Sequence, residues 1–198
     1  MNEDKKAGLL YGSFCADALS LGVHWIYDTK ELAQKHGRVN GYKAPGPDSY
    51  HPHKKAGDQG HVGDQSLCLL KFLVREKLWD PIAFMDDWLG MWPEYNDYLD
   101  GATKATLANV QEQADKTLGG SDSVEIAGPA RIAPVIAFLS DSSEKDVVQA
   151  AVEQTMLTHR SKEALESAVF LAQAGYRLMH GADLMGTLQA TAPEWALK

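Results

Sequence analysis

The sequence predicts an all-α protein built as a single domain. Apolar residues recur at helical spacing in successive segments, for example at Leu9, Phe14 and Leu21 in the first of them. No run of alternating apolar and polar residues is bounded by hairpin turns, so the alternative of a sheet is weak. The 198 residues contain no internal repeat, low-complexity tract or linker that would divide them. We therefore expect one helical domain over residues 1–198.

The first helix is predicted from Lys6 to Trp25. Its small residues Gly12, Ser13 and Ala16 would let a neighbour approach closely, so we expect this helix to be buried. Further helices are expected from Asp64 to Leu78, Pro81 to Met91, Thr103 to Thr117, Pro129 to Phe138, Ser143 to Leu157 and Lys162 to His180. The total is about eight helices.

Composition excludes several classes of partner. Lysine and arginine total 19 against 27 aspartates and glutamates, which gives a formal net charge of −8. A negative protein repels phosphate backbones and anionic lipid surfaces. We therefore expect neither nucleic acid nor a membrane as a partner, while a homo-oligomer remains open.

The two cysteines and the N-terminal segment indicate where the protein works. Cys15 and Cys68 both lie in apolar stretches, which is more typical of buried thiols than of a disulfide. The apolar stretch 7–23 is interrupted by Asp17 and preceded by charge-balanced residues, unlike a signal peptide. No other stretch approaches the length of a membrane span. The prediction is a reducing, cytoplasmic location.

Two acidic positions could carry chemistry. Asp17 lies in the middle of an apolar helix, so its carboxylate needs a partner: it is either a buried scaffold residue or a catalytic one. Residues 57–66 contain Gly-Asp-Gln twice, and Asp64, Gln65 and Ser66 could offer consecutive oxygens to Mg²⁺ or Mn²⁺. The alternative is that Asp64 simply caps the following helix. The surrounding segment 37–63 is rich in loop-forming residues and long enough to be a functional loop.

The histidines and one glycine-rich turn leave further alternatives open. His51 and His53 form a pair without a third ligand nearby, a pattern typical of a solvent-exposed loop. His159 lies between two predicted helices, where it either bonds to backbone or faces a site. The turn at residues 119–131 could offer backbone amides to phosphate, but it is equally a plain helix connector.

Taken in order, five segments resemble the ADP-ribosylglycohydrolase family. They are Gly12-Ser13-Phe14-Cys15-Ala16-Asp17-Ala18-Leu19, Gly63-Asp64-Gln65-Ser66, Asp100-Gly101-Ala102-Thr103, Ala130-Arg131-Ile132-Ala133-Pro134 and Leu157-Thr158-His159-Arg160. Each match is loose, but their shared order over residues 7–178 makes the resemblance specific. The segment 21–28 and the Gly-Asp-Gln variant are similar to the branch that includes jellyfish crystallins and related selenoproteins.

The resemblance implies an orthogonal helical bundle that binds ADP-ribose, or a small molecule or protein carrying it, and hydrolyses its N- or O-glycosidic bond. It implies a divalent metal, Mg²⁺ or Mn²⁺, with two ions in the family. By position, Asp64, Gln65 and Ser66 would hold the metal, and Asp64 and His24 would be catalytic. The resemblance also places the substrate-binding residues Thr103, Arg131 and His159 in the segments around the cleft, with Asp17 as a structural residue near the site.

Three departures from the family pattern leave the activity open. Gln65 replaces a second aspartate, and His24 stands where many members have a glutamate, for which Asp28 could compensate. The sequence also has no Gly-Gly-Asp-x-Asp or Gly-Gly-Asp-Asn segment, which supplies the other half of the family's metal cage, so the bundle is short at its C-terminal end. The alternatives to a hydrolase are a non-catalytic ADP-ribose-binding or crystallin-like relative, and a truncated, inactive chain.

Overall fold

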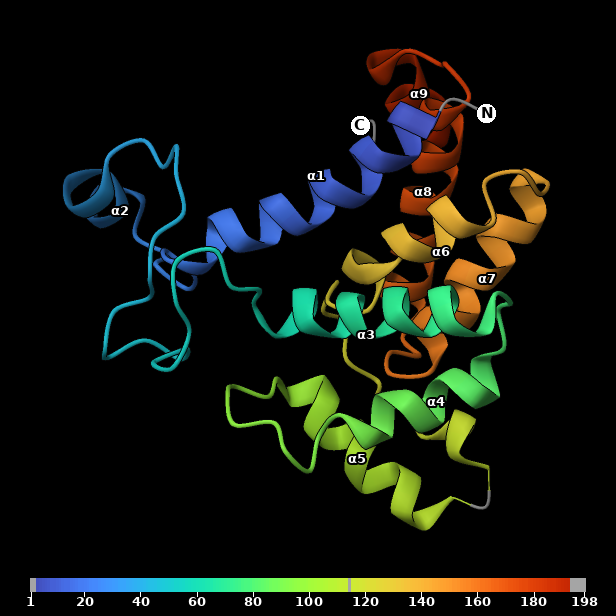
Figure 1. Ribbon diagram of the computed structural model, residues 1–198, viewed down its shortest axis with the longest axis horizontal. Helices are drawn as coiled ribbons and strands as arrows, with labels where there is room; N and C mark the ends of the chain where they lie inside the picture. Colours follow the sequence, from blue (N-terminus) through green and yellow to red (C-terminus); the bar gives the residue numbers. More distant parts are fainter. Residues whose placement is uncertain (1–2, 114, 193–198) are drawn as a thin grey trace.

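The computed structural model describes residues 3–113 and 115–192, which form helices joined by loops, with one isolated β-bridge between Ser121 and His159 (Figure 1). The helices are α1 (Glu3–Leu21), α2 (Thr29–His36), α3 (His61–Glu76), α4 (Pro81–Gly90), α5 (Gly101–Glu112), α6 (Ala133–Phe138), α7 (Glu144–Met156), α8 (Lys162–Met179) and α9 (Leu184–Thr191), with short 3-10 helices η1 (Lys116–Leu118) and η2 (Pro129–Arg131). The predicted all-α class is confirmed. None of the described helices is long and apolar enough to cross a membrane.

Side-chain caps explain where most helices begin, including the two that sequence analysis missed. Asp28 accepts hydrogen bonds from the backbone N–H groups of Lys30 and Glu31 at the start of α2. Asp183 accepts from Gly186 N at the start of α9. Each of these helices has only eight residues, too few for an apolar periodicity to show in the sequence. The cap supplies the missing partner for an N-terminal amide in each case.

Helix α3 is the centre of the bundle and packs against α1, α4 and α6 (Figure 1). Its Leu69 and Phe72 meet Phe84, Met85 and Trp88 of α4 in one cluster, and all five are at most 1% exposed. Burying a large apolar side chain contributes roughly 1.5–3 kcal/mol relative to leaving it in water. This cluster fixes the direction of α3 and so the position of its N-terminal turn.

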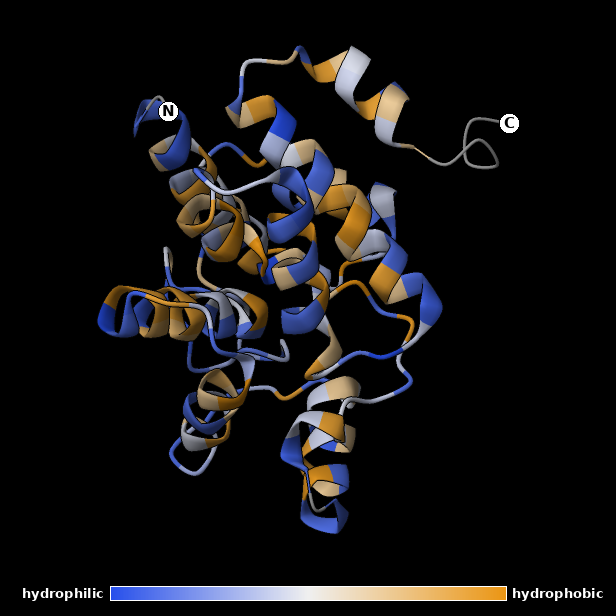
Figure 2. Cartoon of the chain, turned by 90° about the vertical axis from the view of Figure 1, so that its right-hand side faces the viewer, coloured by the Kyte–Doolittle hydropathy of each residue, from blue (hydrophilic) through white to orange (hydrophobic). Residues whose placement is uncertain are grey.

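A second core lies where α6, α7 and α8 meet. Ile136 of α6, Val147 and Ala151 of α7 and Ala172 of α8 are buried against one another. Alanine at the contact lets α7 and α8 lie close together, and this is the most extensive helix pair in the molecule. Figure 2 shows the resulting helices with apolar and polar sides.

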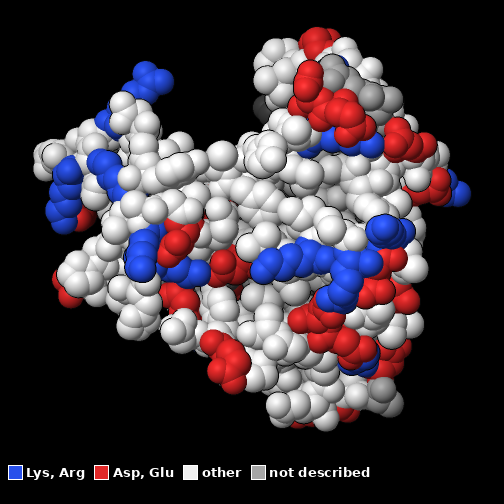
Figure 3. Space-filling model, viewed as in Figure 1, with Lys and Arg blue, Asp and Glu red and all other residues white. Residues whose placement is uncertain are grey.

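Helix α1 is largely exposed, which corrects the expectation of a buried first helix. Only its last residues Ala18 and Leu21 are buried, and no atom lies within 4 Å of a Cβ placed on Gly12. Cys15 on the same helix is exposed and Cys68 is half-buried, so the expected burial of both thiols is also wrong. In Figure 3 the outer surface along α1, between α2 and α9, is formed mostly by uncharged residues.

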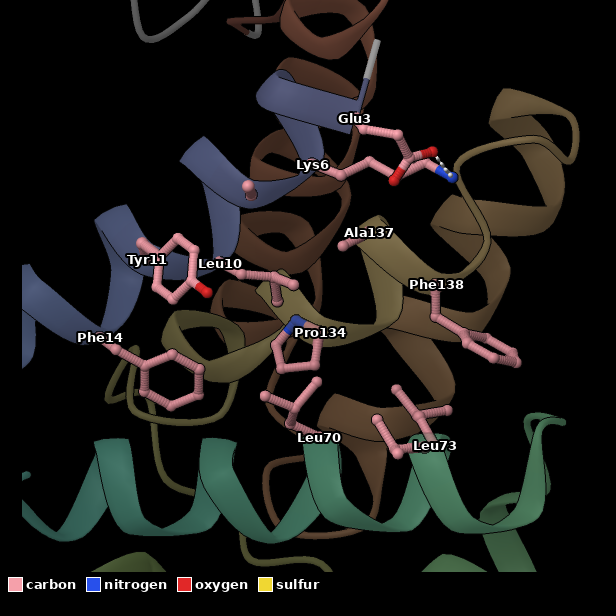
Figure 4. Close-up of a pocket in the computed structure, with 12 residues that line it drawn as sticks. Glu3, Lys6, Leu10, Tyr11, Phe14, Leu70, Leu73, Pro134, Ala137 and Phe138 are labelled. Atoms are coloured by element: carbon pink, nitrogen blue, oxygen red, sulfur yellow. Dashed lines mark ion pairs between the residues drawn. The ribbon is translucent and has the colours of Figure 1, made fainter. Parts of the chain in front are cut away.

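An apolar groove of about 400 Å³ separates α1 from α3 and α6 (Figure 4). Leu10 and Phe14 of α1 face Leu70 of α3 and Pro134 of α6 across it, and an ion pair between Glu3 and Lys6 closes one end. A Cβ on Gly8 or Gly12 of α1 would meet no atom within 4 Å, so these two positions pack against no neighbouring helix among the described residues.

Two glycines with opposite surroundings give a paired test of this packing. A Cβ on Gly120 would lie 2.3 Å from the carbonyl oxygen of Met156, whereas Gly12 faces open space inside a helix. We expect Gly120→Ala to lower the free energy of unfolding by about 1–3 kcal/mol because backbone must move, and Gly12→Ala to raise it by about 0.5–1 kcal/mol. Urea unfolding measures both; equal effects of the two substitutions would contradict the packing described.

Candidate functional site

A cavity of about 570 Å³ opens at the N-terminal end of α3. Four segments line it: the turn after α1 with His24 and Trp25, the start of α3 with His61, the segment before α5, and the loop before η2. Trp25 has φ 65°, a left-handed conformation that costs a non-glycine residue about 1–3 kcal/mol and is common at functional sites. Its ring stacks on that of His24 with the centroids 4.3 Å apart.

Three histidine rings lie nearly parallel beside this cavity. The His24 and His51 centroids are 5.2 Å apart and those of His24 and His61 are 6.4 Å apart, with interplanar angles of 11° and 13°. His24 Nδ1 lies 3.0 Å from His51 Nε2, and His51 Nδ1 lies 2.9 Å from Asp97 Oδ2. Burial, together with the neighbouring His51 and His61, lowers the pKa of His24 to about 4. His24 is therefore neutral at neutral pH.

Asp100 is the buried one of two carboxylates that line the cavity, and the other is the exposed Glu125. Its Oδ2 lies 2.9 Å from His61 Nε2, and its Oδ1 accepts a hydrogen bond from Thr103 N at 2.6 Å, which caps α5. Burial acts to raise the pKa of Asp100, but the hydrogen bonds from His61 and Thr103 outweigh it and hold that pKa well below its ordinary value. The lining of the cavity thus includes an ionised carboxylate, Asp100, and a neutral imidazole, His24.

Asp17 ties the end of α1 to the loop before α3. Its Oδ2 accepts a hydrogen bond from Gly60 N at 2.6 Å, and burial raises its pKa. A Cβ on Gly63 would lie 2.4 Å from the same oxygen, so a larger residue there would displace the Asp17 carboxylate. These contacts agree with the interpretation of Asp17 as a scaffold residue near the site.

Asp64 lies outside this cavity, so the structure does not bring the two expected catalytic residues, Asp64 and His24, into one pocket. Asp64 accepts hydrogen bonds from Lys54 Nζ at 2.5 Å and from Tyr95 Oη at 2.8 Å, and it lines a separate cavity of about 470 Å³. It does not cap α3 either, because that helix begins three residues earlier, after Gly60. Burial, followed by the charge of Asp64, raises the pKa of Tyr95 far above its ordinary value, so Tyr95 stays a donor.

The contacts of Gln65 and Ser66 oppose their expected role as metal ligands. Gln65 is fully buried: its Oε1 accepts from Trp88 Nε1 at 2.7 Å and from Arg131, and its Nε2 donates to the His61 carbonyl. Ser66 is 5% exposed and donates to the carbonyl of Arg131. Successive residues of a helix are about 100° apart around its axis, so Asp64 faces outward while Gln65 and Ser66 face the core.

The three expected substrate-binding residues support the cavity wall from behind. Arg131, Thr103 and His159 are each 1% exposed. The Arg131 guanidinium donates to Gln65 and to Thr158 Oγ1, and burial lowers its pKa to about 10. His159 Nδ1 lies 2.9 Å from Thr158 Oγ1, and burial lowers the pKa of His159 to about 4.

Sequence analysis missed the residues that orient the histidines. His51 is 1% exposed, so the expectation of a solvent-exposed loop position is wrong for His51, although His53 is indeed exposed. The partner that buries His51 is Asp97, which is 46 residues away in the chain. The His51-Pro-His53 pair was the available signal, but no local pattern links it to Asp97.

The described residues do not form a site for the expected divalent ion. No group of three or more His, Cys, Asp or Glu among them is arranged to hold a metal. A hard cation needs several oxygen ligands, and the one aspartate of the predicted motif that faces a cavity, Asp64, is already neutralised by Lys54. The oxygen donors of the described residues therefore do not fit Mg²⁺ or Mn²⁺.

The buried His159 predicts a pH dependence of stability. Its pKa is about 4 in the folded protein, below the ordinary value of 6.5, so the unfolded chain binds the proton more tightly. The stability is therefore complete above pH 6.5 and is lost as the pH falls toward 4, at up to about 1.4 kcal/mol per pH unit for one group. We expect His159→Gln to flatten this dependence in urea unfolding between pH 7 and 4, and exposed His53→Gln to leave it unchanged; an equally steep His159→Gln profile would contradict this account.

Known proteins share this architecture. A solved structure described as an ADP-ribosylglycohydrolase-related protein complex superposes with a TM-score of 0.74 at 24% identity, over 95% of this chain and 60% of that one. Crystallin J1A of Tripedalia cystophora is 25% identical over 91% of this chain and 60% of its own length, so the chain spans about 60% of the length of either relative. The family model described as ADP-ribosylglycohydrolase matches residues 2–198. The chain belongs to the ADP-ribosylglycohydrolase family.

Proposed function

We propose that the protein is an ADP-ribosylglycohydrolase-like hydrolase that binds an ADP-ribosyl group in the cavity beside α3 and cleaves its N- or O-glycosidic bond. Residues 1–198 would act as one helical domain, and the two free cysteines support a reducing, cytoplasmic location. The ligand would be ADP-ribose itself or a small molecule or protein that carries it. Family membership supports this class of ligand.

The observation that carries the proposal is the pairing of Asp100 with His24 in one cavity. Cleavage of a glycosidic bond passes through a transition state with positive charge on the sugar ring. A carboxylate held in its ionised form by His61 and Thr103 would stabilise that charge. Neutral His24 would accept a hydrogen bond from a sugar hydroxyl or from water. Trp25 and Tyr98 give the cavity the flat apolar walls on which a base or a sugar ring can stack.

The family is generally dependent on a divalent metal. We propose Mg²⁺ or Mn²⁺ from family membership alone, because the ion pair between Asp64 and Lys54 opposes a metal at Asp64. The hydrolysis assay is therefore run both with and without the ion.

A second candidate function is non-catalytic binding of ADP-ribose, or a structural role as in a crystallin. The contacts of the predicted metal motif favour it. Lys54 neutralises Asp64, and the side-chain oxygen of Gln65 already accepts a hydrogen bond from Trp88 in the core. Both a hydrolase and a protein that only binds ADP-ribose would have such a cavity, so the cavity does not distinguish the two functions. Binding and turnover therefore have to be measured separately.

The location of the ligand is tested by two matched substitutions. Ile126 lines the cavity and is 62% exposed, and Val74 on α3 is 67% exposed and lines the apolar groove instead. We expect Ile126→Glu to weaken ADP-ribose binding at least about tenfold, equivalent to about 1.4 kcal/mol, because it adds a negative charge where the diphosphate must approach. Val74→Glu should leave the affinity unchanged. Calorimetric titration with ADP-ribose measures both, and equal affinities for the two variants would place the ligand elsewhere.

A substitution of Asp100, the buried carboxylate of the cavity, tests the proposed reaction. Asp100→Asn keeps an oxygen to cap α5 but removes the charge, so we expect the release of ADP-ribose from ADP-ribosylated arginine to slow by about 100-fold or more. The matched control is Asp115→Asn, which changes the exposed cap of η1 and should retain full turnover.

A wild-type protein that binds ADP-ribose but shows no release, with Mg²⁺, with Mn²⁺ or without either, would overturn the hydrolase in favour of the non-catalytic function. A protein that neither binds nor releases ADP-ribose would leave a structural role or an inactive chain.

A further inference from the structure

Asp97, His51 and His24 form a continuous chain of hydrogen bonds that ends at the cavity. The segment between α4 and α5 supplies Asp97, the long loop before α3 supplies His51, and the turn after α1 supplies His24. The side chains of Asp97 and His51 are each 2% exposed, so water does not compete for these contacts. Only His24 reaches the cavity wall.

The contacts determine which ring nitrogens carry protons. Asp97 Oδ2 and His51 Nδ1 are 2.9 Å apart, and Lys54 Nζ lies 3.9 Å from the same oxygen, so the carboxylate is the acceptor and His51 Nδ1 carries the proton. When His51 is neutral, its Nε2 carries a lone pair, and His24 Nδ1, which lies 3.0 Å from that nitrogen, donates to it.

We propose that Asp97 and His51 are positioning residues that hold His24 as the Nδ1–H tautomer, with Nε2 as a hydrogen-bond acceptor for a ligand hydroxyl in the cavity. Nε2 of His24 makes no hydrogen bond with any of the described residues. With the opposite tautomer of His24, the lone pair of its Nδ1 would face the lone pair on Nε2 of a neutral His51 at 3.0 Å. The same logic orients other histidines whose second nitrogen faces a reacting group.

Stacking on Trp25 also restricts the orientation of the His24 ring plane. The His24 ring stacks on Trp25, with the centroids 4.3 Å apart and the planes at 16°, and it lies nearly parallel to the His51 ring, with the centroids 5.2 Å apart and the planes at 11°. A ring fixed in this way can form its second hydrogen bond only along one direction. The choice of a hydroxyl as the partner rests on the proposed function, because a ribosyl group presents hydroxyl donors, but the tautomer itself does not depend on it.

The experiment is a two-bond ¹H–¹⁵N correlation spectrum of protein labelled at histidine, recorded near neutral pH, with His24 assigned from the signals lost in His24→Gln. In the wild type we expect Nδ1 of both His24 and His51 to be protonated and Nε2 of both to be unprotonated. A His24 protonated at Nε2 would overturn the proposal.

The matched variants are His51→Phe and His53→Phe. His51→Phe keeps an aromatic ring at this position but removes the acceptor for His24 Nδ1–H, so the protonated Nδ1 population of His24 should fall by at least half. His53 is exposed in the same loop, and its substitution should leave the His24 pattern unchanged. An unchanged tautomer in a folded His51→Phe would overturn the relay. If His51→Phe does not fold, the wild-type spectrum alone decides.

Addition of ADP-ribose separates this proposal from the proposed function. A shift of the His24 Nε2 signal on saturation supports the hydroxyl contact and the acceptor role. The expected tautomers without any shift would overturn the contact with this ligand and leave the positioning role of Asp97 and His51 standing.

Discussion

A buried arginine joins the segments on which the cavity rests. Arg131 of η2 donates to Gln65 of α3 and to Thr158 after α7, and it is 1% exposed. Removing a guanidinium from water costs several kcal/mol unless its hydrogen bonds are replaced, so these partners are constrained to stay in place. Trp88 of α4 donates to the same Gln65 oxygen and links the apolar core to this polar centre. The N-terminal turn of α3 is therefore fixed from the side opposite the cavity.

This constraint explains why the predicted metal motif is divided between two environments. The helical turn that sends Gln65 inward to Arg131 sends Asp64 outward, where Lys54 and Tyr95 engage it. A neutral amide suits the buried position because it accepts from the guanidinium without a second ionised group. The glutamine that departs from the family pattern thus has a clear structural role in this chain, and the proposed chemistry rests on His24 and Asp100 instead.

The polar wall of the cavity contains His24 and His61, and neighbouring carboxylates influence where their protons lie. Asp100 sets the proton of His61 from one side, and Asp97 acts on His24 through His51 from the other. Both carboxylates come from the segment between α4 and the start of α5, so a single short stretch of chain orients both imidazoles. A site built in this way presents acceptors to its ligand, which suits a polyhydroxylated sugar better than a phosphate group.

The sequence by itself determined the helical class, most of the helices and the family, because apolar periodicity, cap residues and ordered motifs are local patterns. It also predicted that the carboxylate of Asp17 needs a partner, which the structure supplies as the backbone N–H of Gly60. It did not determine that α1 is exposed, since small residues permit a close neighbour without supplying one, nor that His51 is buried, since Asp97 approaches it only through the fold. The outward or inward direction of Asp64 and Gln65 was likewise decided by the tertiary structure. Spacing places residues on a helix, but the packing of α3 against Trp88 and Arg131 decides which of them reach a cavity.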